Sequence, residues 1–504
     1  MPAAPLREQN SKMPFWLGRQ AAARGDQWAV LAAGGRWTFA DLAREAGAWA
    51  GRLHALGVAP GDRVAVLMGN SAGFVALVHA CSGLDAILVP LNIRLSPAEI
   101  GWQLADCGAR VLIHDGDRAA AAQHATAEAG CRAYSVDALA QTAVPAAPAL
   151  PAAIDLQQVQ AVIYTSGTTG QPKGALLTYG NHWWSAMGSA LNLGTHTTDR
   201  WLACLPLFHV GGLAILMRSV IYGLPVVVHE SFDPAAVNAA IDADGVTIVS
   251  VVSTMLRRML DARGGTPYPA SLRAVLLGGG PAPRPLLEEC AARGVPVVQT
   301  YGLTEAASQV ATLAPADALR KLGSAGQPLL PTALRIVGPA GDLPAGAVGE
   351  ILVQGPTITP GYLGRPEATA RALRDGWLHT GDLGYRDADG YLYVVDRRDD
   401  LIISGGENVY PAEVEAVLLA HPAVADAGVI GIPDPQWGQV VQAAVVRQPG
   451  STLTAEDLLS FCRARLGRYK VPAAIRFMDT LPRNAAGKLL RRALRTDSPE
   501  EALP

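Results

Sequence analysis

The chain has 504 residues, of which half are hydrophobic and 17% are charged, and its formal net charge is −3. This length exceeds a single hydrophobic core and predicts two or three domains, and the composition is that of a globular protein. The small net charge gives no electrostatic reason for nucleic-acid binding or for adsorption to an anionic membrane.

The cysteines and the apolar segments indicate in which cellular compartment the protein is expected. Six cysteines occur without a C-x-x-C pair, which argues against a disulfide framework or a zinc site and suits a reducing cytosol, so we expect a cytoplasmic protein. The first residues lack the apolar core of a signal peptide, and Met13 is an alternative start to Met1. The most apolar window, residues 201–217, contains Pro206 and His209, so we expect a buried segment there rather than a membrane span.

Helix-start signals and short apolar runs alternate through the first 120 residues. Thr38 and Asp41 are spaced as a capping box, and the sequence Ser96-Pro97-x-Glu99 predicts a second helix start. A further helix is predicted near residues 74–81, and strands are predicted at 63–68, 86–90 and 111–114. This alternation predicts an α/β layer with a mostly parallel sheet.

The middle of the chain continues the alternation and then changes character. After an Ala/Pro-rich loop at 138–153, buried strands are predicted at 225–229, 247–252, 274–277 and 295–300. From about Gly323, short strands with Gly/Pro turns predict a β-rich subdomain, with strands at 334–337, 350–353 and 390–395.

A charged segment, residues 396–400, separates two apolar strands, and we place the domain boundary there. The predicted domains are residues 1–397, with layered α/β subdomains and the β-rich subdomain, and residues 398–504, a small α+β domain that we expect to be mobile. In the second domain, helices are predicted at 411–419 and 455–466 and strands at 424–432, 440–447 and 474–478.

An apolar run at 161–164 leads into Thr165–Gly174, which consists almost entirely of Gly, Ser, Thr, one Pro and Lys173. Hydroxyls, backbone N–H groups and a cation on a flexible turn suit a polyphosphate, and glycine allows the backbone to approach it closely. The spacing differs from that of a Walker A loop. A plain surface loop is the alternative interpretation of such a run.

This string closely resembles the phosphate loop of the adenylate-forming superfamily, which includes acyl-CoA synthetases, luciferases and peptide-synthetase adenylation domains. Five further stretches match that superfamily in the same order, so the resemblance covers nearly the whole chain. It implies that the phosphates of ATP are bound by Thr165, Ser166, Gly167, Thr168, Thr169, Gly170 and Lys173.

Residues 299–305 follow a predicted strand, the usual place for a ligand in an open α/β sheet. The resemblance implies that Tyr301 stacks on adenine beside Gly302, that Thr304 meets the α-phosphate and that Glu305 helps to hold Mg²⁺. A carboxylate and a hydroxyl are suitable partners for that hard cation. The alternative is a helix N-cap at Thr304. Residues 278–283 resemble the adenine-side loop, with Gly279 and Gly280; the alternative is an ordinary turn.

The remaining motifs lie around the predicted domain boundary. The sequence His379-Thr380-Gly381-Asp382 resembles the block in which Asp382 binds the ribose hydroxyls. Arg397 resembles a nucleotide-contacting arginine, and Asp399 falls on the hinge position, although a solvated linker is the alternative interpretation. Just beyond, Gly405 and Gly406 would line a channel for the thiol.

Residues 482–488 match the C-terminal block that carries the catalytic lysine, here Lys488. The implied chemistry has two steps: the acid attacks the α-phosphate of ATP to give an acyl-adenylate and pyrophosphate, and a thiol then displaces AMP. A loop-borne cation would stabilise the charge that develops in the first step. Withdrawing Lys488 would open the site to the thiol arm of coenzyme A in the second.

The acid specificity is expected in the middle of the chain. Residues 205–213 correspond to the acyl-pocket block, with His209 beside the reacting carboxylate; a core histidine is the alternative. Several local strings resemble the o-succinylbenzoate–CoA ligases of menaquinone biosynthesis, whose substrate carries an aromatic ring and a second carboxylate. Arg218 is the candidate cation for that carboxylate, with Ser308 and Gln309 as polar contacts. Arg218 as an ordinary surface residue is the alternative.

The predicted activity is that of an AMP-forming acid–CoA ligase, and the expected partners are a carboxylic acid, ATP with Mg²⁺, and coenzyme A. The alternatives are a fatty-acyl- or aryl-CoA ligase with another pocket, or a free-standing adenylation enzyme that loads a carrier protein. A homo-oligomer is compatible with the sequence.

Overall fold

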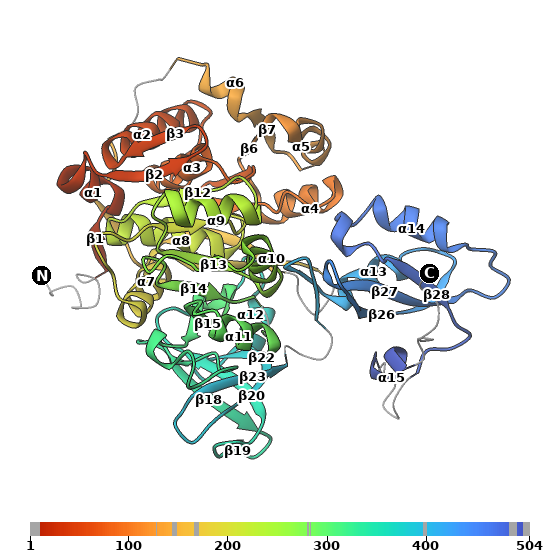
Figure 1. Cartoon of the computed structure of the whole chain (residues 1–504). Helices are drawn as coiled ribbons and strands as arrows, with labels where there is room; N and C mark the ends of the chain where they lie inside the picture. The colour runs from red at the N-terminus through yellow and green to blue at the C-terminus, as the bar shows by residue number, and fades with distance from the viewer. Residues whose placement is uncertain are drawn as a thin grey trace, which may run out of the picture.

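The computed structural model describes residues 11–127, 129–143, 149–165, 171–279, 282, 284–396, 401–482 and 491–496. A large N-terminal domain and a small C-terminal domain are evident, the small domain lying to one side of the large one (Figure 1). The predicted boundary after Arg397 lies outside the described residues, so its position stays a prediction.

The first sheet of the large domain has six strands and confirms the predicted parallel α/β layer. Five strands run parallel and the last one, β10, pairs antiparallel with β9. Across the sheet the strands are β10 (Lys173–Thr178), β9 (Val159–Thr165), β5 (Ile87–Pro90), β4 (Arg63–Leu67), β6 (Val111–His114) and β7 (Arg132–Ser135). The associated helices are α2 (Phe39–Ala55), α3 (Ala72–Gly83), α4 (Pro97–Cys107), α5 (Ala119–Thr126) and α6 (Val136–Ala140).

Local capping chemistry starts two of these helices as predicted. Thr38 and Asp41 form the complete capping box of α2, and Ser96 and Glu99 form that of α4, which begins with Pro97. Such a cap contributes about 1 kcal/mol because it satisfies backbone N–H groups that have no partner inside the helix. Helix α3 is buried along almost its whole length between the two large sheets, so its sequence is apolar all round.

The second sheet has nine strands, and its central strands are parallel. Across the sheet these are β17 (Gln327–Pro328), β16 (Ser308–Thr312), β15 (Val297–Leu303), β14 (Ala274–Leu277), β13 (Ile248–Val251), β11 (Trp201–Ala203), β12 (Val226–Val228), β2 (Trp28–Ala32) and β3 (Gly35–Thr38). Its helices are α1 (Trp16–Arg24), α7 (Tyr179–Leu193), α8 (Val210–Tyr222), α9 (Pro234–Ala243), α10 (Ser253–Arg263) and α11 (Arg284–Ala292). A two-stranded sheet pairs β1 (Lys12–Pro14) with β8 (Ala153–Asp155).

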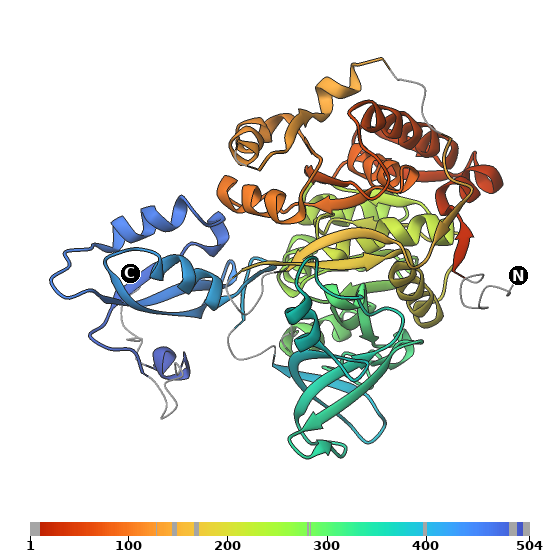
Figure 2. The ribbon, with the colours of Figure 1, turned by 180° about the vertical axis from the view of Figure 1, so that it is seen from behind.

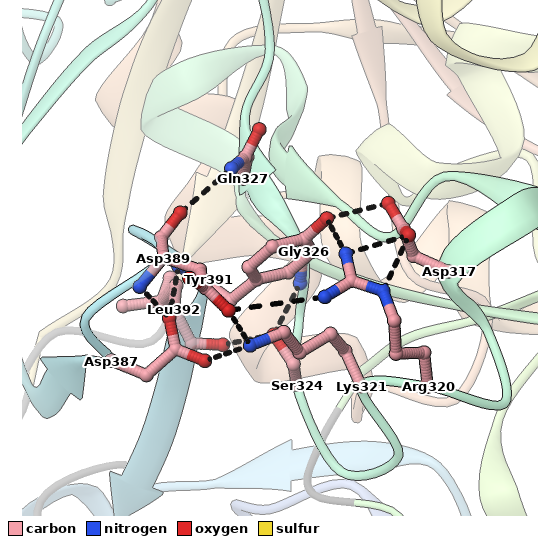
Figure 3. Close-up of polar contacts among 10 residues, drawn as sticks. All are labelled: Asp317, Arg320, Lys321, Ser324, Gly326, Gln327, Asp387, Asp389, Tyr391 and Leu392. Atoms are coloured by element: carbon pink, nitrogen blue, oxygen red, sulfur yellow. Dashed lines mark hydrogen bonds and ion pairs between the residues drawn. The ribbon is translucent and has the colours of Figure 1, made fainter.

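The predicted β-rich subdomain is an antiparallel sheet with one short helix, α12 (Pro366–Ala372). Its strands are β18 (Ala333–Gly338), β19 (Gly341–Asp342), β20 (Gly349–Gln354), β21 (Leu373–Arg374), β22 (Trp377–Arg386) and β23 (Leu392–Asp396). Lys321 ties a preceding loop to the β22–β23 turn: its Nζ lies 2.6 Å from a carboxylate oxygen of both Asp387 and Asp389 and 4.7 Å from the ring centre of Tyr391 (Figure 3).

The small domain has its own hydrophobic core and confirms the predicted α+β arrangement. Its strands are β24 (Ile402–Ser404), β25 (Glu407–Val409), β26 (Val424–Asp434), β27 (Gly438–Arg447) and β28 (Ala474–Phe477), and its helices are α13 (Pro411–Leu419), α14 (Ala455–Arg463) and α15 (Arg491–Thr496). In both views the small domain lies beside α4 of the large domain (Figures 1 and 2).

All six cysteines are buried and form no disulfide. Burial raises the pKa of the thiols, to about 12 for Cys81, Cys107 and Cys204 and to about 11 for Cys131, Cys290 and Cys462. Within the described residues, no helix combines the length and apolar character needed to cross a membrane.

Candidate active site

A sharp reversal of the chain after β15 forms the centre of the candidate site. Gly302 pairs with Gln309 on β16, and a Cβ at position 302 would overlap the carbonyl oxygen of Ser308, so only glycine fits there. Ala307 and Ser308 have φ values of +51° and +100°, a region that L side chains rarely adopt. Such backbone strain persists only where the surroundings impose it, and it is common at functional sites.

The reversal carries Thr304 and Glu305, and its observed form excludes one of the alternatives. Residues 304–306 form a single 3₁₀ turn between two paired strands, so Thr304 does not open an α-helix. The hydroxyl of Ser185 on α7 donates to the carbonyl oxygen of Ala307 at 2.7 Å, which anchors the turn to α7. Thr304 and Glu305 are therefore presented on a rigid edge at the carboxyl ends of parallel strands, where open α/β sheets bind ligands.

The two residues expected at adenine and ribose lie together. The hydroxyl of Tyr301 donates to Oδ2 of Asp382 at 2.6 Å. Asp382 lies within β22, where Gly381, at φ +71°, accompanies a local break in the strand pairing. The sequence His379-Thr380-Gly381-Asp382 is thus part of a long irregular strand, and the irregularity turns Asp382 toward Tyr301.

A tyrosine that the sequence interpretation did not single out connects the metal and phosphate candidates. The hydroxyl of Tyr362 donates to Oε1 of Glu305 at 2.9 Å, and Nζ of Lys173 lies 5.5 Å from the centre of the Tyr362 ring. Burial, and then the charge of Glu305, raise the pKa of Tyr362, so it stays a donor at neutral pH. The turn Pro360-Gly361-Tyr362 was the available signal in the sequence.

The ends of the phosphate loop and of the adenine-side loop are described. Lys173 on β10 pairs with Thr165 on β9, so the two residues lie opposite each other at the ends of these strands. Gly279 follows β14 with φ +82°, and a Cβ there would lie 2.9 Å from Cγ1 of Val252. Several predicted site residues lie outside the described residues: Ser166, Gly167, Thr168, Thr169, Gly170, Gly280, Arg397, Asp399 and Lys488. Their roles stay predictions.

His209 precedes α8 and contacts the small domain. Its side chain is 41% exposed, so it is not a core histidine, and its Nε2 lies 2.9 Å from Oε2 of Glu407. Glu407 follows Gly405 and Gly406, the residues predicted to line the thiol channel. A Cβ at Gly406 would lie 3.4 Å from Val252, the residue that also packs against Gly279. The predicted channel therefore adjoins the adenine-side loop.

Arg218 lies inside the large domain, which excludes the surface alternative. It is 3% exposed, donates to Oγ of Ser185 at 3.3 Å and to Oε1 of Gln309 at 3.1 Å, and lies 5.3 Å from the ring centre of Trp201. Burial lowers its pKa. Among the described residues, no carboxylate forms an ion pair with Arg218, and its Nε and the Nε2 of Gln309 are buried without a hydrogen-bond partner.

The described surroundings of Arg218 leave its charge without a balancing anion. His182 is fully buried beside it, and burial together with the charge of Arg218 lowers the pKa of His182 to about 3, so the imidazole is neutral. A buried guanidinium without a carboxylate is costly, and an anionic ligand would remove that cost. Ser308, the other predicted polar contact, lies next to Gln309 at the reversal. Arg218 and Gln309, which were each predicted to contact the acid, therefore lie in hydrogen-bond contact with each other.

Two family models match the chain. Residues 17–363 match the AMP-binding enzyme model, and residues 413–488 match the model of the AMP-binding enzyme C-terminal domain. The chain belongs to the AMP-binding enzyme family. The first match spans both large sheets and the reversal at 302–308, and the second covers most of the small domain.

Members of this family resemble the chain over nearly its whole length. The 2-succinylbenzoate–CoA ligase of Geobacillus kaustophilus is 53% identical, covering 96% of this chain and 97% of the relative. A double mutant of o-succinylbenzoate CoA synthetase from Bacillus subtilis, bound to a product analogue, has a TM-score of 0.92 at 44% identity and covers 97% of this chain and 99% of that one. The same enzyme with its acyl-adenylate intermediate has a TM-score of 0.76 at 44% identity, covering 98% and 100%.

The two TM-scores differ although the identity is the same, so the difference lies in the relative placement of parts of the chain rather than in local folding. The described arrangement of the large and small domains therefore resembles the product-analogue complex more closely than the acyl-adenylate complex.

Proposed function

We propose that this chain is an AMP-forming ligase that joins 2-succinylbenzoate (o-succinylbenzoate) to coenzyme A. The observation that carries this conclusion is 53% identity across nearly the whole chain to a ligase of that name, which exceeds what the shared family alone requires. The buried Arg218 agrees with it, because this acid keeps a second carboxylate that does not react.

In the first step a carboxylate oxygen attacks the α-phosphorus of ATP, the bond to the bridging oxygen breaks and pyrophosphate leaves. We assign the nucleoside to Tyr301 and Asp382 and the phosphates to Lys173 with the preceding loop. Glu305 and Thr304 would hold Mg²⁺, because a carboxylate and a hydroxyl suit its preference for oxygen and leave positions for phosphate and water. Bound Mg²⁺ neutralises phosphate charge; Lys488 would do the same at the reacting oxygens.

In the second step the thiol of coenzyme A attacks the acyl carbon, AMP leaves with the bonding electron pair, and the thiol proton is released. We assign the path of the thiol arm to Gly405 and Gly406, because glycines leave room beside the adenine-side loop. Between the steps, a rotation of the small domain about Asp399 would move Lys488 away from the reacting groups and bring Gly405 and Gly406 to them. His209 is assigned to the carboxylate of the acid.

Arg218 with Gln309 would hold the carboxylate that does not react. The guanidinium would donate from its free Nε and the amide from its free Nε2. The hydrogen bond from the guanidinium to the anion would be charge-assisted. This arrangement fixes the orientation of a dicarboxylic acid and rejects acids that end in an alkyl chain, because such acids would leave the cation buried without a partner.

The substrate is tested by ATP–pyrophosphate exchange with a panel of acids. We expect exchange with 2-succinylbenzoate and much weaker exchange with fatty acids and simple aryl acids; preference for one of the latter would refute the assignment. Two analogues, each lacking one of the two carboxylates, identify which one is activated. Thioester formation with coenzyme A, rather than with a carrier protein, separates this function from that of a loading enzyme. We also place the reaction in the cytoplasm, and sedimentation distinguishes a monomer from a homo-oligomer.

A further inference from the structure

One loop of the large domain, residues 92–99, receives two separate segments of the small domain. It follows β5 and ends at the N-terminus of α4, far from the nucleotide motifs in the sequence. The turn 404–407 contacts its first half, and the segment 465–470, which follows α14, contacts its second half.

The first contact is centred on Glu407, which is 2% exposed. Its Oε1 lies 2.7 Å from a guanidinium nitrogen of Arg94, and its Oε2 lies 3.4 Å from Nδ2 of Asn92 and 2.9 Å from Nε2 of His209. Burial alone would raise the pKa of Glu407, but the charges of His209 and Arg94 outweigh it and lower the pKa. All three partners belong to the large domain, so Glu407 loses every one of them if the domains separate.

The second contact is centred on Lys470, which is 3% exposed. Its Nζ lies 3.0 Å from Oε1 of Glu99 in the large domain and 2.6 Å from Oε1 of Glu413 in its own domain. The hydroxyl of Ser96 donates to the carbonyl oxygen of Arg465 at 3.0 Å. Glu99 also caps α4, so its position is fixed before the small domain arrives.

Packing between the two contacts is close. A Cβ on Gly467 would lie 2.5 Å from the carbonyl oxygen of Arg94, so the two backbones touch. The hydroxyl of Tyr469 lies 3.1 Å from Nδ2 of Asn92. Removing one member of a buried charge pair leaves the other desolvated without compensation, which is strongly unfavourable. The contacts therefore stabilise this placement of the small domain relative to slightly different placements, in which the charge pairs would be broken.

We propose that the loop 92–99 is the seat on which the small domain docks for thioester formation, and that Arg94, Glu407, Lys470 and Glu99 are positioning residues for that step alone. The inference rests on the proposed function, and it follows from the match of this domain arrangement to the product-analogue complex rather than to the acyl-adenylate complex. Docking also brings Glu407 to His209, the residue assigned to the carboxylate of the acid. In this arrangement Nε2 of His209 therefore contacts Glu407.

The test measures the two half-reactions separately. Arg94 is 46% exposed, so Arg94→Met should fold normally. We expect Arg94→Met to slow thioester formation from preformed acyl-adenylate and coenzyme A at least tenfold, with pyrophosphate exchange within twofold of the parent. Arg94→Lys, which keeps the charge, should restore most of the second step.

Arg465→Gln is the matched control. It removes a positive charge from the same segment, but the guanidinium of Arg465 contacts Phe461 of its own domain, and only its backbone carbonyl reaches Ser96. Both rates should stay at the parent level. An unchanged thioester step in Arg94→Met, or an equal fall of both half-reactions, would overturn the proposal. If 2-succinylbenzoate gives no exchange with the parent protein, the proposed function fails, and the ratio of the two rates is then measured with whichever panel acid is activated.

Discussion

Arg218 is the side chain on which the proposed specificity for a dicarboxylic acid depends. It is a buried cation, which we propose binds the acid, and its hydrogen-bonding neighbours are neutral groups, Ser185 and Gln309. Since a neutral hydroxyl and amide do not balance a full charge in a desolvated position, the site is incomplete without an anion.

We therefore expect Arg218→Met to weaken 2-succinylbenzoate binding by about 1.5–3 kcal/mol, the range for hydrogen bonds to charged groups, or roughly 10- to 150-fold. The same loss should follow from removing the non-reacting carboxylate of the acid in the parent protein. Combining both changes should cost little more than either one alone, because they break the same contact. Fully additive losses, measured as KM in pyrophosphate exchange, would place Arg218 away from the acid.

Asp199 has a structural task. It accepts from Arg273 at 2.6 and 2.7 Å and from Thr247 at 2.8 Å, and its side chain is 2% exposed. These contacts join the segment before β11 to the starts of β13 and β14. Burial alone would raise the pKa of Asp199, but the hydrogen bonds from Arg273 prevail and lower it.

Asp199→Asn should lower the free energy of unfolding by about 2–3 kcal/mol, somewhat less than the roughly 3–5 kcal/mol of fully buried pairs, because Arg273 keeps 18% exposure. The lowered pKa means that the ionised form is favoured by folding. The stabilisation is therefore present above the ordinary value of 3.8 and is lost as the pH falls through the lower folded value. Denaturant unfolding at pH 7 measures it. Glu456→Gln, in the exposed pair with Arg463, is the control and should cost less than about 1 kcal/mol.

Individual site residues were predictable to the extent that their chemistry is local. Arg218 and Gln309 were predicted, from the resemblance to o-succinylbenzoate–CoA ligases, as contacts of the acid, and the structure shows that they are hydrogen-bonded to each other; their role toward the acid stays a prediction. Tyr362 was missed because it reaches Glu305 from 57 positions along the chain, and the contact of Glu407 with His209 was missed because 198 positions separate them. No local pattern specifies such pairs; tertiary packing brings them together.

Among the elements, the hairpin of β15 and β16 carries backbone strain at the turn that presents Thr304 and Glu305, the residues proposed to hold Mg²⁺. Gly302 touches the backbone of Ser308, and two non-glycine residues with positive φ follow within six positions. We expect Gly302→Ala to force this backbone apart and displace Thr304 and Glu305. A displacement of about 1 Å costs on the order of 10²-fold in rate, and both half-reactions should fall.

Gly47→Ala is the control for that change. Gly47 lies inside α2, where a Cβ would meet nothing within 4 Å, so the substitution should leave the rates unchanged and stabilise the helix by up to about 1 kcal/mol. A normal pyrophosphate exchange rate in Gly302→Ala would show that the hairpin does not position the turn.

Elements with strong local signals were predicted well. The two capping boxes placed α2 and α4, and buried apolar runs placed β4, β6 and β14 because a strand buried on both faces reads as a continuous apolar segment. Helix α7 was not predicted: its capping box pairs Thr178 with Asn181 rather than with a glutamate, and its sequence mixes tryptophan with glycine and serine. The short strands β1 and β8 have no local signal, since only their pairing with each other defines them.

At the scale of the whole molecule, we propose that the reaction is divided between two placements of the small domain. The described placement buries Glu407 and Lys470 against the loop 92–99 and puts Gly406 next to Val252. The placement that brings Lys488 to the reacting phosphate was deduced only from the resemblance, because a sequence pattern does not report rigid-body positions.

We expect Lys488→Ala to slow adenylate formation by roughly 10²- to 10³-fold, the range for loss of one group that stabilises developing negative charge. Thioester formation from preformed acyl-adenylate should stay close to the parent rate, because that step uses the other placement. Rapid-quench measurement of each half-reaction provides the check, and the second serves as the control for the first. Equal losses in both would contradict the two-placement scheme.

The burial of all six cysteines has a practical consequence. A thiol reacts with disulfide reagents through its thiolate, and a pKa of about 11 or 12 leaves very little thiolate near neutral pH, in side chains that solvent also does not reach. A chromogenic disulfide such as Ellman's reagent should therefore titrate free coenzyme A in samples withdrawn during turnover with negligible background from the native protein. The same reagent should report six protein thiols once the chain is unfolded, which makes colour development a direct measure of global unfolding.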